Sequence, residues 1–187
     1  MSALLLGAAL WPSTPAPASS CAGVSLPERV RVAGAEFVLN GIGVRKATLL
    51  QIEVYVAGLY LTHQVAEAEQ ILNGDLDWHL AMAFVRDVDA AKMRDAFTRG
   101  LAANSGDALE KLQPDIDQFT AAIVDVVEGQ TVSFTHAQDS GVVIAVDGDA
   151  RGRIDNPHFA EALLSIWLGP KPSDKALKTG LLGGPCA

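Results

Sequence analysis

The sequence predicts a single α+β domain with an antiparallel sheet that buries one face under helices. Two observations lead to this prediction. Alternating apolar and polar residues, typical of strands, occur within 30–61, 76–86 and 131–154. Apolar residues spaced three or four positions apart, typical of helices, occur within 89–127 and 156–182. Strands and helices that are grouped in this way along a chain are typical of α+β proteins.

Three strands are predicted in the first half of the chain. Residues 30–39 alternate up to Asn40–Gly43, a turn signal that predicts the end of a hairpin there. Residues 50–61 form a long strand, and a short helix over 66–72 follows it. Residues 76–86 form the third strand, in which one face carries apolar residues that form the core or a cavity wall: Trp78, Leu80, Met82 and Phe84, with Arg86 at its end.

Helices and short strands make up the second half. One helix is predicted over 89–104 and another over 107–127, where Pro114 divides the pattern. Three short strands are predicted over 131–134, 142–146 and 151–154, separated by turn signals. The closing helix begins at Asn156-Pro157, a cap followed by proline at the first helical position, and extends to Gly169. A short helix over 173–182 packs the tail.

The N-terminal region differs from the rest. Residues 3–10 are apolar, residues 11–20 are rich in Pro, Ser and Ala, and the first charged residue is Glu28. This composition predicts a signal peptide over 1–18, a leader segment over 19–29 and the domain over 30–187, although the usual positive N-terminal region is missing. We therefore expect an exported, periplasmic protein. No later apolar stretch approaches the roughly 20 residues that a spanning helix needs.

The two cysteines, Cys21 and Cys186, lie near opposite ends of the chain and have no metal-binding spacing. In an oxidising compartment they could form a disulfide, or Cys21 could carry a lipid. The interpretation we favour from the sequence is two free thiols.

Composition and motifs exclude several classes of function. A net charge of −8 and a pI near 4.8, with no basic cluster, argue against nucleic acid as a partner. Phosphate-binding, hydrolase, metalloprotease and dinucleotide motifs are absent from the sequence. The four histidines have no ligand spacing, so neither a metal nor another cofactor is expected.

Two arginines are candidates for binding an anion. Arg45 follows the glycine-rich segment, and its guanidinium offers a fork of donors that suits a carboxylate or phenolate. The alternative for Arg45 is an ordinary ion pair with Glu53 or another acid. Arg86, at the end of an apolar strand face, is exposed, binds an anion, or pairs with a nearby aspartate, which is the interpretation that we favour.

Four blocks of the sequence, 39–45 (LNGIGVR), 51–61 (QIEVYVAGLYL), 84–92 (FVRDVDAAK) and 162–169 (ALLSIWLG), resemble the chalcone isomerase-like family in order and spacing. The resemblance implies an open-faced β-sandwich, in which a long antiparallel sheet carries a layer of α-helices and a cleft lies between them. In the plant enzymes an arginine of the glycine-rich block steadies the phenolate during closure of a chalcone to a flavanone. Arg45 matches that arginine, and Ser165 matches a hydroxyl residue of the closing helix.

Other positions depart from the enzymes. Tyr55 stands where the enzymes carry a threonine, and the helix over 89–104 has no counterpart of their catalytic tyrosine. An arginine and a strand tyrosine resemble instead the fatty-acid-binding members, where such a pair holds the carboxylate. Arg86 lies in a block typical of bacterial relatives.

The resemblance therefore implies non-catalytic binding of a fatty acid or similar amphipathic carboxylate. We expect the protein to be a monomer. The ligand-binding residues would be Arg45 and Tyr55, with Ser165 and Arg86 as further candidates. One alternative is an intramolecular lyase of the chalcone isomerase type, with Arg45 as the catalytic residue. A second alternative is a structural or partner-binding protein that keeps only the fold.

Overall fold

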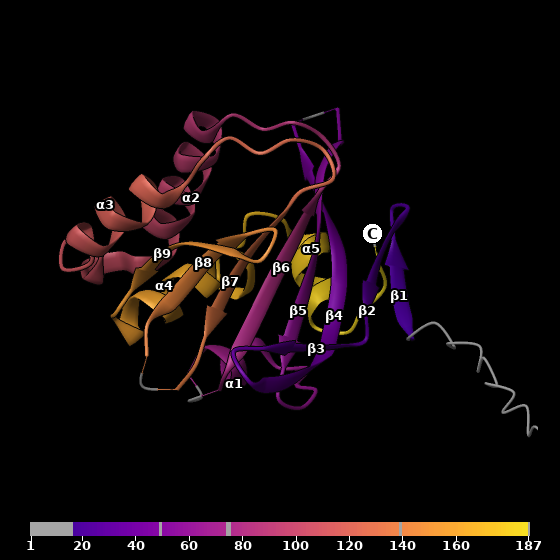
Figure 1. The fold of residues 1–187 in the computed structure, drawn as a ribbon. Coiled ribbons are helices and arrows are strands. Elements are labelled where there is room, and N and C mark those ends of the chain that lie inside the picture. The colour runs from indigo at the N-terminus through magenta and orange to yellow at the C-terminus, as the bar shows by residue number, and fades with distance from the viewer. Residues whose placement is uncertain (1–16, 49, 74–75, 139, 187) are drawn as a thin grey trace, which may run out of the picture.

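A computed structural model describes residues 17–48, 50–73, 76–138 and 140–186 of the chain (Figure 1). The signal peptide expected over 1–18 lies outside the described residues, apart from its last two positions. Within the described part, no helix is both long and apolar enough to cross a membrane.

A seven-stranded antiparallel sheet forms the centre of the molecule. Its strands follow one another in chain order from β3 to β9, so each strand pairs with its neighbour in sequence. Residues ahead of the sheet form a separate two-stranded hairpin, β1 Ala18–Cys21 and β2 Val24–Pro27. The strands of the sheet are β3 Arg29–Val32, β4 Ala35–Ala47, β5 Ile52–Leu61, β6 Trp78–Phe84, β7 Thr131–His136, β8 Val142–Val146 and β9 Asp149–Ile154.

Helices cover one face of this sheet, with α2, α3 and α4 over its β6–β9 half and α5 close to β4 and β5 (Figure 1). The predicted α+β fold, a long antiparallel sheet with a helical layer, is confirmed. The helix expected over 107–127 is shorter and is divided before Pro114, which lies in the first turn of α3. The helices are α1 Ala68–Leu72, α2 Ala90–Ser105, the 3-10 turn Gly106–Ala108, α3 Gln113–Ala122, α4 Pro157–Leu168 and α5 Lys175–Leu181.

The predicted hairpin at Asn40–Gly43 is wrong, because this segment lies in the middle of β4, a continuous strand of 13 residues. The chain turns earlier, between β3 and β4, and later, between β4 and β5. A bulge at Asn40 interrupts the β4–β5 register, and its buried side chain joins two distant segments. Asn40 Nδ2 donates to Leu181 O at 2.8 Å, and Asn40 Oδ1 accepts from Val65 N at 2.7 Å.

The glycines of this segment allow α5 to approach the sheet closely. A Cβ atom at Gly41 would lie 2.1 Å from Gly180 O, and one at Gly43 would lie 3.0 Å from the Leu177 side chain. A Cβ at Gly180 would in turn lie 2.5 Å from Ile42 O. The turn-like composition of this segment therefore serves backbone packing rather than chain reversal.

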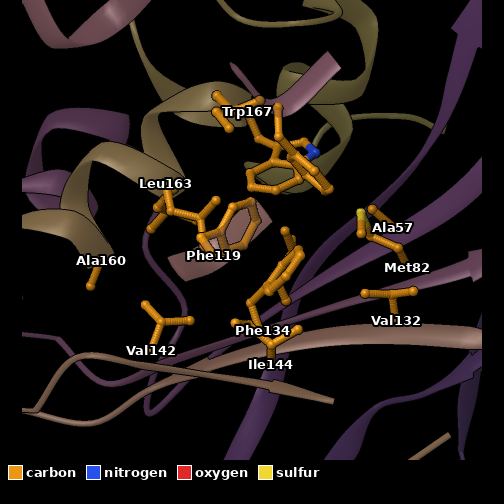
Figure 2. Packing of buried hydrophobic residues seen from close by; sticks show 14 of the residues in the cluster. Ala57, Met82, Phe119, Val132, Phe134, Val142, Ile144, Ala160, Leu163 and Trp167 are labelled. Carbon is orange, nitrogen blue, oxygen red and sulfur yellow. The ribbon is translucent and has the colours of Figure 1, made fainter. Parts of the chain in front are cut away.

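The main core lies between the sheet and the helices (Figure 2). From the sheet it includes Met82 and Phe134, and from the helices it includes Phe119 and Trp167. The rings of Phe134 and Trp167 lie 5.9 Å apart, and those of Phe119 and Phe134 lie 5.7 Å apart. Such pairs add to the stabilisation from buried apolar area.

The β1–β2 hairpin covers part of the second face of the sheet. Its Cys21 and Leu26 pack against three sheet residues, Ile42, Val44 and Val56. Residues 19–29, which we expected to be a leader ahead of the domain, thus contain β2 and all of β1 except Ala18, and they contact the sheet.

The interpretation of Cys21 and Cys186 as two free thiols is wrong, because they form a disulfide with a Cα–Cα distance of 5.8 Å. Cys21 lies at the end of β1, and Cys186 lies five positions after the end of α5. The N-terminal hairpin and the C-terminus lie side by side in Figure 1. The bond therefore ties the hairpin on one face to the helix on the other.

On the same second face, His79 is buried and its Nδ1 lies 2.8 Å from Thr135 Oγ1. Burial lowers the pKa of His79 to about 4. Between about pH 6.5 and 4, this histidine is protonated in the unfolded chain, where its pKa is near 6.5, but not in the folded protein. Acidification over this range therefore favours unfolding.

We expect His79 alone to lower the free energy of unfolding by about 3 kcal/mol across this pH range. Urea unfolding of wild type and of His79→Gln, at pH 7 and pH 4.5, measures the effect. The variant should lose less stability than wild type on acidification, since glutamine does not titrate. Equal losses would contradict the prediction.

Candidate functional site

A cavity of about 770 Å³ lies between the helix-facing side of the sheet, α2, α4 and residues 171–173. Its volume is in the range of cavities that hold small ligands. The walls are mainly apolar, and the larger apolar side chains that line the cavity are Ile52, Val54, Met82, Phe84, Val88, Met93, Phe97, Ile166 and Trp167. Of the β6 face predicted as core or cavity wall, Met82 and Phe84 line the cavity, whereas Trp78 and Leu80 do not.

Arg45 and Tyr55 both line this cavity, and β4 and β5 place them directly opposite each other. Opposed residues of an antiparallel pair point to the same side of the sheet, so both side chains face the helices. The structure thus brings these two predicted residues together in the lining of the cavity.

Arg45 is paired with an acid other than Glu53. Its Nη1 lies 3.5 Å from Asp174 Oδ2 and also donates to the carbonyl oxygen of Lys46. Asp174 is the N-cap of α5, and its Oδ1 accepts from Ala176 N and Leu177 N. Arg45 and Asp174 keep only 26% and 16% of their side-chain surface exposed, so water screens this pair less than a surface pair.

The hydroxyl oxygen of Tyr55 accepts a hydrogen bond from Trp167, and this bond does not use the hydroxyl proton. Trp167 Nε1 donates to Tyr55 Oη at 3.0 Å, and the Phe84 ring packs 5.4 Å from the tyrosine ring. Burial raises the pKa of Tyr55, and the charge of Asp174 adds to this shift, whereas the hydrogen bond from Trp167, the charge of Arg45 and the Ser173 hydroxyl oppose it. The phenol is therefore protonated at neutral pH and can donate a hydrogen bond to a group in the cavity.

Arg86 lines the cavity but is exposed, and the predicted pairing with a nearby aspartate is wrong. No carboxylate of the described residues forms an ion pair with it. The three candidate partners bind elsewhere: Asp87 accepts from Glu128 N, Asp89 pairs with Lys92, and Asp95 pairs with Arg99.

Ser165 does not join the other predicted residues. It is buried in α4, its Oγ donates to Ala162 O at 2.6 Å, and it lines a second cavity of about 680 Å³. The side chains that follow it, Ile166 and Trp167, line the first cavity instead. The helix thus turns Ser165 away from Arg45.

Sequence reasoning missed Trp167 and Asp174, the two residues that contact Tyr55 and Arg45. The cap pattern at Ser173-Asp174 could have indicated that Asp174 begins a helix. Nothing local indicates that α5 lies beside β4, about 130 positions earlier in the chain. Within the described ranges, no three His, Cys, Asp or Glu side chains form a group that could hold a metal ion.

Fold and cavity together define an antiparallel sheet with one helical layer and a largely apolar cavity, which an arginine and a tyrosine line from two neighbouring strands. Residues 18–183 match the chalcone isomerase-like family over most of the chain, and the chain belongs to that family. The resemblance seen in the sequence is therefore confirmed.

Among solved structures, the chain is similar to a fatty-acid binding protein of Arabidopsis thaliana. The TM-score is 0.71 at 18% sequence identity, over 86% of this chain and 92% of that chain. At this identity the similarity shows a shared fold. No curated protein matches the sequence.

Proposed function

We propose that this protein binds a fatty acid or a similar amphipathic carboxylate in the cavity, without turning it over. The observation that supports this most directly is that Arg45 and Tyr55 lie opposite each other in the lining of a largely apolar cavity. These two residues offer hydrogen bonds, charge-assisted from Arg45, and the apolar side chains of the walls suit a hydrocarbon chain.

The head group would bind to donors that the protein leaves free. Arg45 uses Nη1 for Asp174 and Lys46, while its Nε and Nη2 make no hydrogen bond to the described residues. Tyr55 contributes the proton that its contact with Trp167 does not use. Arg86 lies along the same cavity as an exposed cation and would add a weaker, solvent-screened attraction.

The alkyl chain would lie along the apolar walls formed by β5, β6, α2 and α4. Burial of one methylene contributes about 0.8 kcal/mol, so affinity should rise about fourfold for each added carbon while the chain still fits. The structural similarity to a protein described as fatty-acid binding also supports the proposal.

We expect Arg45→Gln to lower the affinity for dodecanoate by about 10- to 100-fold, the equivalent of one or two charge-assisted hydrogen bonds. Titration calorimetry measures the affinity, and mass spectrometry of lipids that co-purify from a cell extract tests it independently. Arg99→Gln is the matched control, because Arg99 also lines the cavity but is exposed and paired with Asp95. Equal lipid content and equal affinity in wild type and Arg45→Gln would contradict the proposal.

The same protein preparations decide the alternative of chalcone ring closure. Tyr60, the other of the two tyrosines in the chain, lies on the opposite face of the sheet, where its Oη donates to Pro27 O at 3.0 Å. An isomerase would thus have to work with Arg45 and Tyr55. Ring closure well above the spontaneous rate, and lost in Arg45→Gln, would replace the binding function with the enzymatic one.

The proposal includes export to an oxidising compartment, such as the periplasm. The Cys21–Cys186 disulfide supports this, because disulfides persist mainly outside the reducing cytoplasm. Fractionation of cells, followed by alkylation of free thiols and mass measurement, tests both the location and the bond. A reduced protein in the cytoplasmic fraction would contradict export.

A further inference from the structure

The Arg45–Asp174 pair bears on which head groups the cavity accepts. Because Asp174 Oδ2 lies 3.5 Å from Arg45 Nη1, the positive charge of the guanidinium is already balanced by a carboxylate of the protein. A ligand that binds the remaining donors of Arg45 therefore places its own negative charge near that of Asp174.

Asp174 is held in place from several sides. Its Oδ1 caps α5, and its Oδ2 also accepts from Lys46 N at 3.3 Å. The helix that follows packs against β4 at Gly41 with no room for a Cβ atom, and the disulfide at Cys186 ties the segment after the helix to the N-terminal hairpin. Asp174 is therefore fixed beside Arg45 and shares the guanidinium with any bound anion.

The other cations of the cavity do not offset this carboxylate to the same degree. Arg86 and Lys171 are exposed, so water and salt screen them. Lys92 and Arg99 are paired with Asp89 and Asp95. Asp174, with 16% of its side chain exposed, lies in a region of weaker screening.

We propose that Asp174 determines the charge selectivity of the cavity, so that it accepts amphiphiles with a neutral or singly negative head group and excludes phosphate monoesters. The inference rests on the proposed binding function. The carboxylate of a fatty acid, with one negative charge, is tolerated because Arg45 and Tyr55 supply free donors. A dianionic phosphate meets an arginine whose charge Asp174 already balances, so its second negative charge gains little net attraction, yet that charge must also lose its water.

Three ligands with the same twelve-carbon chain test this proposal: dodecanol, dodecanoate and dodecyl phosphate. At pH 8 a phosphate monoester carries close to two negative charges. In the wild type we expect dodecyl phosphate to bind at least tenfold more weakly than dodecanoate. Calorimetric titration with monomeric ligand measures all three affinities.

Asp174→Ser is the main variant, because the serine hydroxyl can still cap α5 but carries no negative charge and offers no second oxygen to Arg45. Affinity should rise about tenfold for dodecanoate and about 100-fold for dodecyl phosphate, and should not change for dodecanol. Asp174→Asn should give the same order of effects. Asp95→Asn, which removes a carboxylate from another arginine of the cavity, is the control and should leave the selectivity unchanged.

Each outcome is decisive. Equal changes for all three ligands would mean that Asp174 acts only through the structure of α5, and unchanged affinities in both Asp174 variants would also overturn the inference. Binding of dodecanoate that responds to Arg45→Gln but not to Asp174→Ser would leave the proposed function intact and refute this inference alone. If the wild type binds neither dodecanol nor dodecanoate, the proposed function fails, and the selectivity proposal fails with it.

Discussion

Removal of the Cys21–Cys186 disulfide is expected to lower the free energy of unfolding by about 3 to 5 kcal/mol. The two cysteines are 165 positions apart, and a cross-link that closes so long a loop strongly restricts the unfolded chain. Urea unfolding of wild type and of the Cys21→Ser/Cys186→Ser variant measures the difference. Since a typical domain has a total stability of about 5 to 15 kcal/mol, this is a large fraction.

The loss should begin at the ends of the chain. Cys21 packs over Val44 and Val56, and Cys186 follows α5, so hydrogen exchange should increase first in the β1–β2 hairpin and in α5. Dithiothreitol added to the double variant is the control and should have no effect. An unchanged unfolding midpoint in the fully reduced wild type would contradict the prediction.

Gly41→Ala is expected to destabilise the protein by about 3 kcal/mol or more. The new Cβ atom would lie 2.1 Å from Gly180 O and 2.6 Å from Leu181 C, and these are backbone atoms that can move only with the whole of α5. Overpacking of this kind costs about 1 to 3 kcal/mol even where side chains can adjust. Thermal unfolding followed by circular dichroism measures the effect.

Gly152→Ala provides the matched control in another strand. There a Cβ atom would lie 2.9 Å from Ala122 Cβ, at the last residue of α3, and 3.5 Å from Ile144 Cδ1, so the overlap is much smaller than at Gly41. Its cost should be about 1 kcal/mol. Because displacement of α5 also displaces Asp174, Gly41→Ala should in addition change the affinity for dodecanoate, whereas Gly152→Ala should not. Equal stability of both variants would show that α5 tolerates a wider separation from β4.

Sequence reasoning predicted most elements to within a few residues. The strands over 50–61 and 142–146 and the helix over 89–104 correspond to β5, β8 and α2. In each of these elements the spacing of apolar residues matches a strand or a helix and indicates which face is buried. The family resemblance added Arg45 and Tyr55, and the structure places both at the cavity.

The errors concern features that depend on distant partners. Asn40–Gly43 has the composition of a turn, but its glycines are explained by α5, which packs against them from the other end of the chain. The pairing of Cys21 with Cys186 likewise cannot be predicted from the residues near either cysteine. Arg86 was expected to pair with a neighbouring aspartate, and each of those aspartates has another partner.

By itself the sequence determined the α+β class and most of the helices and strands from β5 onward, and its resemblance to the family indicated an arginine and a tyrosine as candidates for binding a carboxylate. The class and the elements follow from local periodicity, and the two residues follow from short blocks that resemble the family. Only the tertiary structure decided that Arg45 forms an ion pair with Asp174 and that Tyr55 accepts a hydrogen bond from Trp167. It also decided that Ser165 lies at a different cavity. The physical reason is that hydrogen bonds and charge pairs join side chains more than 100 positions apart, and their geometry exists only once the sheet and helices have packed.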